Sequence, residues 1–127
     1  MITVRNSIRV AVATKGGGIV NEHFGHAKEF QIYEVNDAQA TFLETRQVIP
    51  YCKGGYGEQS AMDDILQKLS DCTAVLVLKI GAGAEERLRT AGIEAVQVYD
   101  AIETAVLDFY EQWHEINSST PIQEVQV

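Results

Sequence analysis

The 127-residue sequence predicts a single α/β domain in which helices flank a five-stranded mixed sheet. Three kinds of pattern predict it: apolar residues that alternate with others near the N-terminus, one nearly continuous apolar run, and stretches with apolar residues three and four positions apart. The first two patterns are typical of strands, half buried and fully buried, and the third is typical of helices. Their order along the chain is βββαβαβα.

Three strands are predicted in the first half of the chain. Residues 8–13 alternate Ile, Val and Val with smaller or polar residues, which indicates a central strand whose alanine face is covered closely. Residues 30–35 and 41–49 are rich in β-forming residues, and an Asn-Asp pair between them favours a turn. We therefore expect these two strands to form an antiparallel hairpin.

Two βα units are predicted in the second half. Residues 58–70 and 84–91 have the apolar spacing and end signals of helices, as does a longer stretch from about residue 100. Residues 74–80 form the nearly continuous apolar run expected of a strand buried on both faces, and residues 93–98 give a short final strand.

The simplest sheet for these elements has the strand order 3-2-1-4-5, with strand two antiparallel and strands one, four and five parallel. In open α/β sheets, ligands bind outside the carboxyl ends of the parallel strands. The loops that leave this edge are residues 15–29 after strand one, 50–57 after strand three and 81–83 after strand four. The first loop is much longer than a hairpin needs, which favours a functional role.

Two histidines and one cysteine on these loops are the predicted metal ligands. His23 and His26 lie in the first loop and Cys52 in the second, and imidazole and thiolate are common ligands of iron, copper and zinc. His23 could instead be a loop histidine bonded to the backbone, and His26 could serve only as a hydrogen-bond donor beside a ligand. Cys72 precedes a buried strand and is expected to be a small core residue.

The same edge is predicted to be locally basic and rich in glycine. Lys15, Lys28, Lys53 and Lys79 lie in or beside the loops of an otherwise acidic chain, and the glycine runs expose backbone N–H groups. Such an edge suits an anionic ligand, for which a metal-sulfur cluster is one candidate. The Lys-Gly-Gly-Gly run lacks the spacing and the Ser or Thr of a phosphate-binding loop, so no nucleotide is expected.

Composition excludes several other classes of function. The net charge of -8 argues against nonspecific binding to nucleic acid or to an anionic membrane. No apolar run approaches the length of a membrane span, and we expect a cytoplasmic protein. Two cysteines without a CxxC spacing do not predict a structural disulfide or a zinc ribbon. Residues 1–7 are expected to be a leader, 8–116 the domain, and 117–127 a flexible polar tail.

Several segments carry a resemblance to a known family. Ile8-Arg-Val-Ala-Val-Ala-Thr-Lys-Gly-Gly-Gly precedes Asn21-Glu-His-Phe-Gly-His-Ala, and Tyr51-Cys-Lys-Gly-Gly-Tyr-Gly follows the hairpin. Over about residues 8–113 the chain resembles the dinitrogenase iron-molybdenum cofactor-binding family. The resemblance is strongest to the C-terminal domain of a radical SAM protein of nitrogenase cofactor biosynthesis. It implies a ribonuclease H-like fold.

The resemblance also implies a function. Such a domain binds and carries an iron-sulfur precursor of the iron-molybdenum cofactor in nitrogen fixation, with cofactor scaffold and biosynthesis proteins as partners. The resemblance singles out His23 as the cluster-binding histidine. Together with the loop analysis, the predicted cofactor-binding set is Lys15, Gly16, Gly17, Asn21, His23, His26, Cys52 and Lys53, with His23, His26 and Cys52 as metal ligands.

The chain departs from the radical SAM proteins in one respect. It has no CxxxCxxC motif, so we expect no catalysis by this domain alone, whether it stands free or shares a parent protein with a radical SAM domain. A homodimer in which two chains share one cluster stays open.

Three other functions compete with this one. A docking module for the cofactor synthase or its scaffold would use the same fold without the histidines. A small zinc enzyme would need a general base, and Glu22 and Glu29 lack any recognised hydrolase spacing. A ribonuclease H-like nuclease would need acidic residues on the strands to hold magnesium, and the predicted first strand has none.

Overall fold

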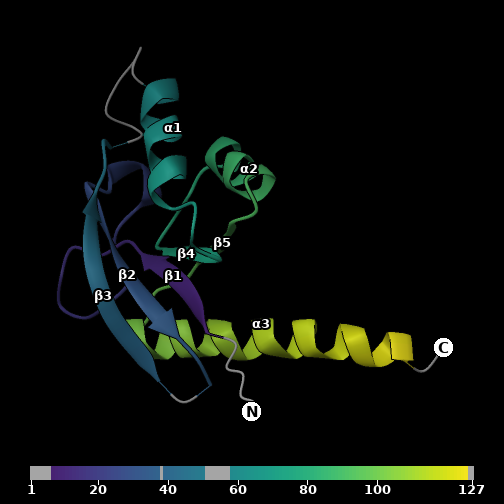
Figure 1. Cartoon of the computed structure of the whole chain (residues 1–127). Coiled ribbons are helices and arrows are strands. Elements are labelled where there is room, and N and C mark those ends of the chain that lie inside the picture. Colours follow the sequence, from purple (N-terminus) through teal and green to yellow (C-terminus); the bar gives the residue numbers. More distant parts are fainter. Residues whose placement is uncertain (1–6, 38, 51–57, 126–127) are drawn as a thin grey trace.

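Five strands form one mixed sheet in the computed structural model, which describes residues 7–37, 39–50 and 58–125 (Figure 1). The strands are β1 (Ile8–Val12), β2 (Glu29–Val35), β3 (Ala40–Gln47), β4 (Ala74–Val77) and β5 (Glu94–Gln97). Their order is β3-β2-β1-β4-β5. β2 is antiparallel to β1 and β3, whereas β4 is parallel to β1 and β5. The α/β class, the strand order and the antiparallel strand two are thus confirmed.

In the described part of the chain, three α-helices cover the two faces of the sheet. They are α1 (Glu58–Lys68), α2 (Ala82–Thr90) and α3 (Ile102–Val125). Figure 1 shows α1 and α2 on one side of the sheet and α3 crossing the other side. The chain therefore forms three layers, with a hydrophobic core on each face of the sheet.

The alternation along β1 explains how the two cores are built. Val10 and Val12 are fully buried in the core that α3 covers, and Ala11 belongs to the core that α1 and α2 cover. A methyl side chain takes little space, so the helices on that face can approach β1 closely. All four residues of β4 are buried, as the continuous apolar run predicted.

Two elements differ most from their predicted ends. The strand predicted over residues 74–80 ends as β4 at Val77. Beyond this point, Leu78 and Lys79 form backbone hydrogen bonds with the loop at Glu22 and Phe24. A polar tail was expected from residue 117, but α3 continues as helix to Val125. The main cost of a helix is its nucleation, so an established helix can extend into a polar sequence at its end.

Within the described part of the chain, no helix combines the length and the apolar character that a membrane crossing requires.

Candidate functional site

The candidate site lies where β1 and β4 end, at the carboxyl edge of the parallel strands. Here the segment from Glu22 to Phe24 runs beside the continuation of β4. The Leu78 N–H donates to the Glu22 carbonyl at 2.9 Å, and the Phe24 N–H donates to the Lys79 carbonyl at 2.9 Å. The Glu22 N–H also donates to the Ala13 carbonyl, at 3.3 Å, just beyond β1. The loop is therefore fixed between the two central strands, as if it were a short additional strand.

A 3-10 turn, η1 (Phe24–His26), positions the two histidines on this edge. The Phe24 ring is buried in the core beneath the turn and packs against Phe30, with ring centroids 5.9 Å apart. The His26 N–H donates to the His23 carbonyl at 3.1 Å and closes the turn. The apolar residue between the histidines anchors the turn, while His23 is half-buried and His26 is exposed.

The two imidazole rings are stacked in parallel. Their centroids lie 5.1 Å apart and their planes meet at 7°. A metal ion bound by imidazole lies close to the plane of the ring, because the nitrogen lone pair lies in that plane. At this spacing the two rings stand close enough to contact one metal site together. The two rings can bind two different metal atoms of one cluster, or one ring can bind a metal atom while the other packs beside it.

A shallow hollow of about 240 Å³ opens beside the histidines. It is lined by His23, Gly25, His26, Lys79, Ile80 and Gly81. Gly81 is also the N-cap of α2, and no side chain caps that end. The first N–H groups of α2 and the Lys79 ammonium therefore give this edge a positive character, which favours an anion.

The glycine loop that follows β1 forms a second, separate part of the edge. Gly16, Gly17 and Gly18 have φ of 115°, 81° and 73°, a left-handed run that glycine adopts most readily. The Asn21 side chain holds this loop: its Oδ1 accepts from the Lys15 N–H at 2.7 Å, and its Nδ2 donates to the Gly16 carbonyl at 3.3 Å.

Thr14 completes the same arrangement. Its hydroxyl is buried, donates to the Ile19 carbonyl at 2.7 Å and accepts from the Gly16 N–H at 2.9 Å. The loop is then joined to the start of α3, since the Ile102 N–H donates to the Gly18 carbonyl at 2.8 Å. The polar groups of Asn21 and Thr14 are thus engaged in shaping the loop.

The structure brings together only part of the predicted set. His23 and His26 share the hollow with Lys79, whereas Lys15, Gly16, Gly17 and Asn21 belong to the neighbouring loop and do not line it. Cys52 and Lys53 lie outside the described residues. Among the residues that are described, no three side chains of His, Cys, Asp or Glu come together as a metal site would require.

The sequence places Lys79 and the 81–83 loop at the same edge as the histidines, but it assigns Ile80 to the preceding strand and does not show that these residues share one hollow with the two rings. The available signal was their position directly after the buried run of β4, at the same carboxyl edge as the first loop.

Cys72 lies in the other direction along the sheet, just before β4. It is 6% exposed, and burial raises the pKa of its thiol to about 12. A thiol with so high a pKa is a poor metal ligand at neutral pH. This agrees with its predicted place in the core.

Comparisons with known proteins were made for the whole chain. The model of the dinitrogenase iron-molybdenum cofactor family matches residues 6–112. The FeMo cofactor biosynthesis protein NifB of Herbaspirillum seropedicae is 50% identical over 106 residues, which are 82% of this chain and 20% of that protein. The NifB protein of Bradyrhizobium diazoefficiens is 43% identical over 122 residues, 94% of this chain and 24% of that protein. The chain therefore spans about one fifth to one quarter of the length of these relatives.

Solved structures show a similar fold. The apo form of the orange protein from Desulfovibrio gigas superposes with a TM-score of 0.60 at 24% sequence identity. The match covers 82% of this chain and 88% of the other. At this identity the likeness concerns the fold alone.

Proposed function

The chain belongs to the dinitrogenase iron-molybdenum cofactor family, and we propose that it holds an iron-sulfur precursor of that cofactor and passes it to a partner protein. The cargo would sit at the edge formed by His23, His26 and Lys79. The domain would change no bonds in the cargo. It would act in nitrogen fixation, as part of iron-molybdenum cofactor biosynthesis, where the NifB relatives are named.

One observation carries this proposal: the parallel stacking of His23 and His26, at 5.1 Å between centroids, beside the uncapped N-terminus of α2. A cluster offers several metal atoms at separate positions, so each of the two neighbouring rings can contact it. The cluster is anionic, so Lys79 and the first N–H groups of α2 would stabilise it. Cys52 is proposed as a further ligand, from the loop that follows β3.

Cluster uptake tests the ligands directly. The chain is incubated anaerobically with ferrous iron and sulfide, and bound iron and visible absorption are measured. Losing even a hydrogen-bond partner of a ligand weakens metal binding by about 10–100-fold, so His23→Ala and Cys52→Ala should reduce uptake at least as strongly. His26→Ala should have a smaller effect if its ring only stacks on His23.

Two matched variants control for nonspecific loss. His114→Ala removes a histidine beside Asn36 and Asp37, which lie at the turn after β2 and thus at the opposite end of the sheet. Cys72→Ala removes the buried thiol. Both should keep normal uptake. Equal uptake by all five variants would reject the ligand assignment.

A further inference from the structure

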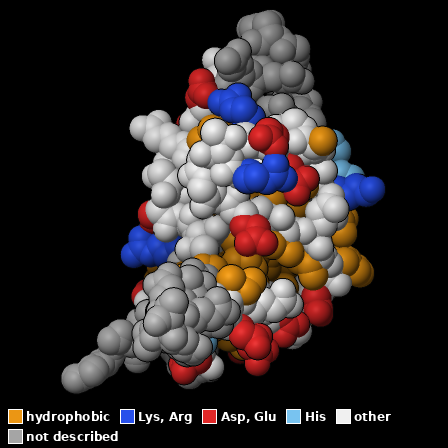
Figure 2. All heavy atoms as spheres, turned by 90° about the vertical axis from the view of Figure 1, so that its right-hand side faces the viewer, with side chains coloured by type: hydrophobic (Ala, Val, Ile, Leu, Met, Phe, Trp, Pro, Cys, Tyr) orange, Lys and Arg blue, Asp and Glu red, His pale blue; other side chains and the backbone are white. Residues whose placement is uncertain are grey.

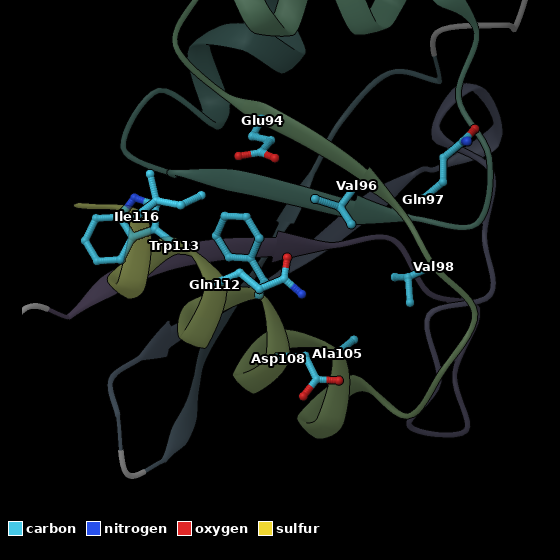
Figure 3. A pocket seen from close by; sticks show the side chains of 10 residues that line it. Glu94, Val96, Gln97, Val98, Ala105, Asp108, Gln112, Trp113 and Ile116 are labelled. Atoms are coloured by element: carbon cyan, nitrogen blue, oxygen red, sulfur yellow. The ribbon is translucent and has the colours of Figure 1, made fainter. Parts of the chain in front are cut away.

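A groove of about 360 Å³ lies between β5 and α3, apart from the histidine edge (Figure 3). Its lining is mainly apolar, from Val96, Val98, Ala105, Phe109, Trp113 and Ile116. Two carboxylates stand at opposite sides, Glu94 from β5 and Asp108 from α3, as Figure 3 shows. Figure 2 shows hydrophobic side chains gathered in the lower part of one face of the molecule, with acidic side chains around them. The groove thus combines an apolar floor with an acidic rim.

The path of α3 explains why the groove is open. α3 packs over β1, β2 and β3, which leaves this face of β5 at the far edge of the sheet less covered. Val96 and Val98 are only partly buried, and Ile116 is 66% exposed. Apolar surface that a folded domain leaves open beside polar groups commonly marks a binding site.

β5 also has a free edge among the described strands, because it is the last strand of the sheet. The N–H groups of Glu94 and Val98 donate to β4 and its flank, at the Thr73 and Val77 carbonyls. Backbone groups alternate in direction along a strand, so those of Ala95 and Gln97 point away from β4. An incoming extended segment can therefore add to β5 by main-chain hydrogen bonds.

Charge decides which occupant fits. A second copy of the chain would bring another acidic rim against Glu94 and Asp108, and each copy carries a net charge of -8. Like charges in apposition oppose such pairing, whereas Lys or Arg on a partner would be attracted. We infer that the groove and the free edge of β5 bind an extended segment of a partner protein whose groove-facing positions carry apolar residues with a Lys or Arg at each end.

The only tryptophan of the chain, Trp113, lines the groove, so its fluorescence reports occupancy. The probe is the blocked peptide Lys-Thr-Val-Thr-Ile-Thr-Lys, in which both Lys residues share one face with Val and Ile, titrated into the full 127-residue chain at low salt. We expect a saturable change in Trp113 fluorescence. The same peptide with Glu at every Lys position should bind far more weakly.

Charge-reversal variants distinguish the groove from general attraction to an acidic protein. Glu94→Lys and Asp108→Lys each remove one rim carboxylate, and each should raise the Kd for the basic peptide by about fivefold. Glu111→Lys changes net charge equally but lies at a separate hollow with Asn36 and Asp37, so it should leave the Kd nearly unchanged. Equal weakening by all three variants would overturn the assignment.

A second comparison tests the strand-like mode of binding. The peptide carrying N-methyl groups on alternate residues cannot donate the main-chain hydrogen bonds to β5, and it should lose binding. Unchanged binding of this peptide would overturn the strand addition. A third experiment measures the sedimentation of the peptide-free chain and of the Ile116→Lys variant. A dimer that the Ile116→Lys substitution dissociates would assign the groove to a second copy of the chain instead.

Discussion

Arg46 and Asp71 form a two-bond ion pair that ties β3 to the turn before β4. The Arg46 Nη1 donates to Oδ1 of Asp71 at 2.7 Å, and Nη2 donates to Oδ2 at 3.0 Å. Arg9 at the start of β1 donates to the same carboxylate at 2.7 Å. The hydrogen bond from Arg46 is the largest cause that holds the pKa of Asp71 well below its usual range. This cluster ties β1 and β3 to the turn before β4.

Asp71→Asn should destabilise the fold at neutral pH. Its side chain is 39% exposed, so solvent screening limits the expected loss to about 1 kcal/mol in the free energy of unfolding. The folded state holds the carboxylate at a lower pKa than the unfolded chain, where it is about 3.9. The stabilisation is therefore present above about pH 4 and is lost as the pH falls further. Urea unfolding of both proteins at pH 7 and pH 3 measures this.

Asp63→Asn is the matched control for that experiment. Asp63 pairs with Arg87 alone at 2.9 Å, and its side chain is 65% exposed. Its replacement should change the unfolding free energy by at most about 0.5 kcal/mol. An equal loss for both variants at pH 7, or a loss for Asp71→Asn that is larger at pH 3 than at pH 7, contradicts the role assigned to Arg46 and Asp71.

Cys72 should resist alkylation until the chain unfolds. Its thiol is buried and its pKa is raised to about 12, chiefly by burial, so very little thiolate forms near neutral pH. In the Cys52→Ala variant, where Cys72 is the remaining cysteine, iodoacetamide at pH 8 should label the native protein far more slowly than the urea-unfolded protein. Mass spectrometry follows the reaction. Comparable labelling rates in the two states would show that the thiol is accessible.

The raised pKa of Cys72 also affects stability in alkaline solution. The unfolded chain loses its thiol proton near pH 8.5, whereas the folded protein keeps it up to about pH 12. The contribution of Cys72 to stability is thus complete below about pH 8.5 and is lost as the pH rises towards 12. Cys72→Ala should show a smaller decline in unfolding free energy between pH 8 and pH 10 than the parent chain.

Two glycine replacements should have opposite signs. An added Cβ would meet open space at both Gly17 and Gly83, so backbone conformation alone decides the result. Gly17 has φ of +81°, where Ala is strained by about 1 kcal/mol, so Gly17→Ala should lower Tm. Gly83 lies within α2, where Ala is favoured by about 0.5–1 kcal/mol, so Gly83→Ala should raise Tm. Thermal unfolding measures both, and shifts of the same sign would refute the argument.

Asn21→Ala should weaken the glycine loop. It removes the acceptor of the Lys15 N–H and the donor to the Gly16 carbonyl, at an expected cost of about 1–2 kcal/mol. Asn21→Asp keeps the acceptor and should lose less. Chemical unfolding ranks the two variants. If both match the parent chain in stability, the Asn21 amide is free for another role, such as the cofactor binding first expected of it.

The sequence predicted the sheet well because its signals are local. Alternation along β1 and the continuous run of β4 report burial directly, and the strand order follows from simple rules of chain connection. The first loop was also recognisable, from its length and its two histidines. The pairing of His23 with Lys79 was not, because it depends on a loop that takes the hydrogen bonds beyond β4.

Other features depend on tertiary placement and leave no clear pattern in the sequence. The stacking of His23 and His26 follows from the turn that the buried Phe24 anchors. The groove beside β5 arises from where α3 crosses the sheet, although Val96 and Trp113 look like ordinary core residues in the sequence. Whether Cys52 joins the histidines stays a prediction, since it lies outside the described residues.

The Gln97 side chain connects the groove beside β5 to the histidine hollow. Its Oε1 accepts a hydrogen bond from the Ile80 N–H at 3.0 Å, and Ile80 lines the histidine hollow while Gln97 lines the groove. A segment that adds to β5 would bond to the Gln97 backbone and fix the position of this side chain. Docking at β5 would thus also restrain Ile80 at the histidine hollow, through this one hydrogen bond.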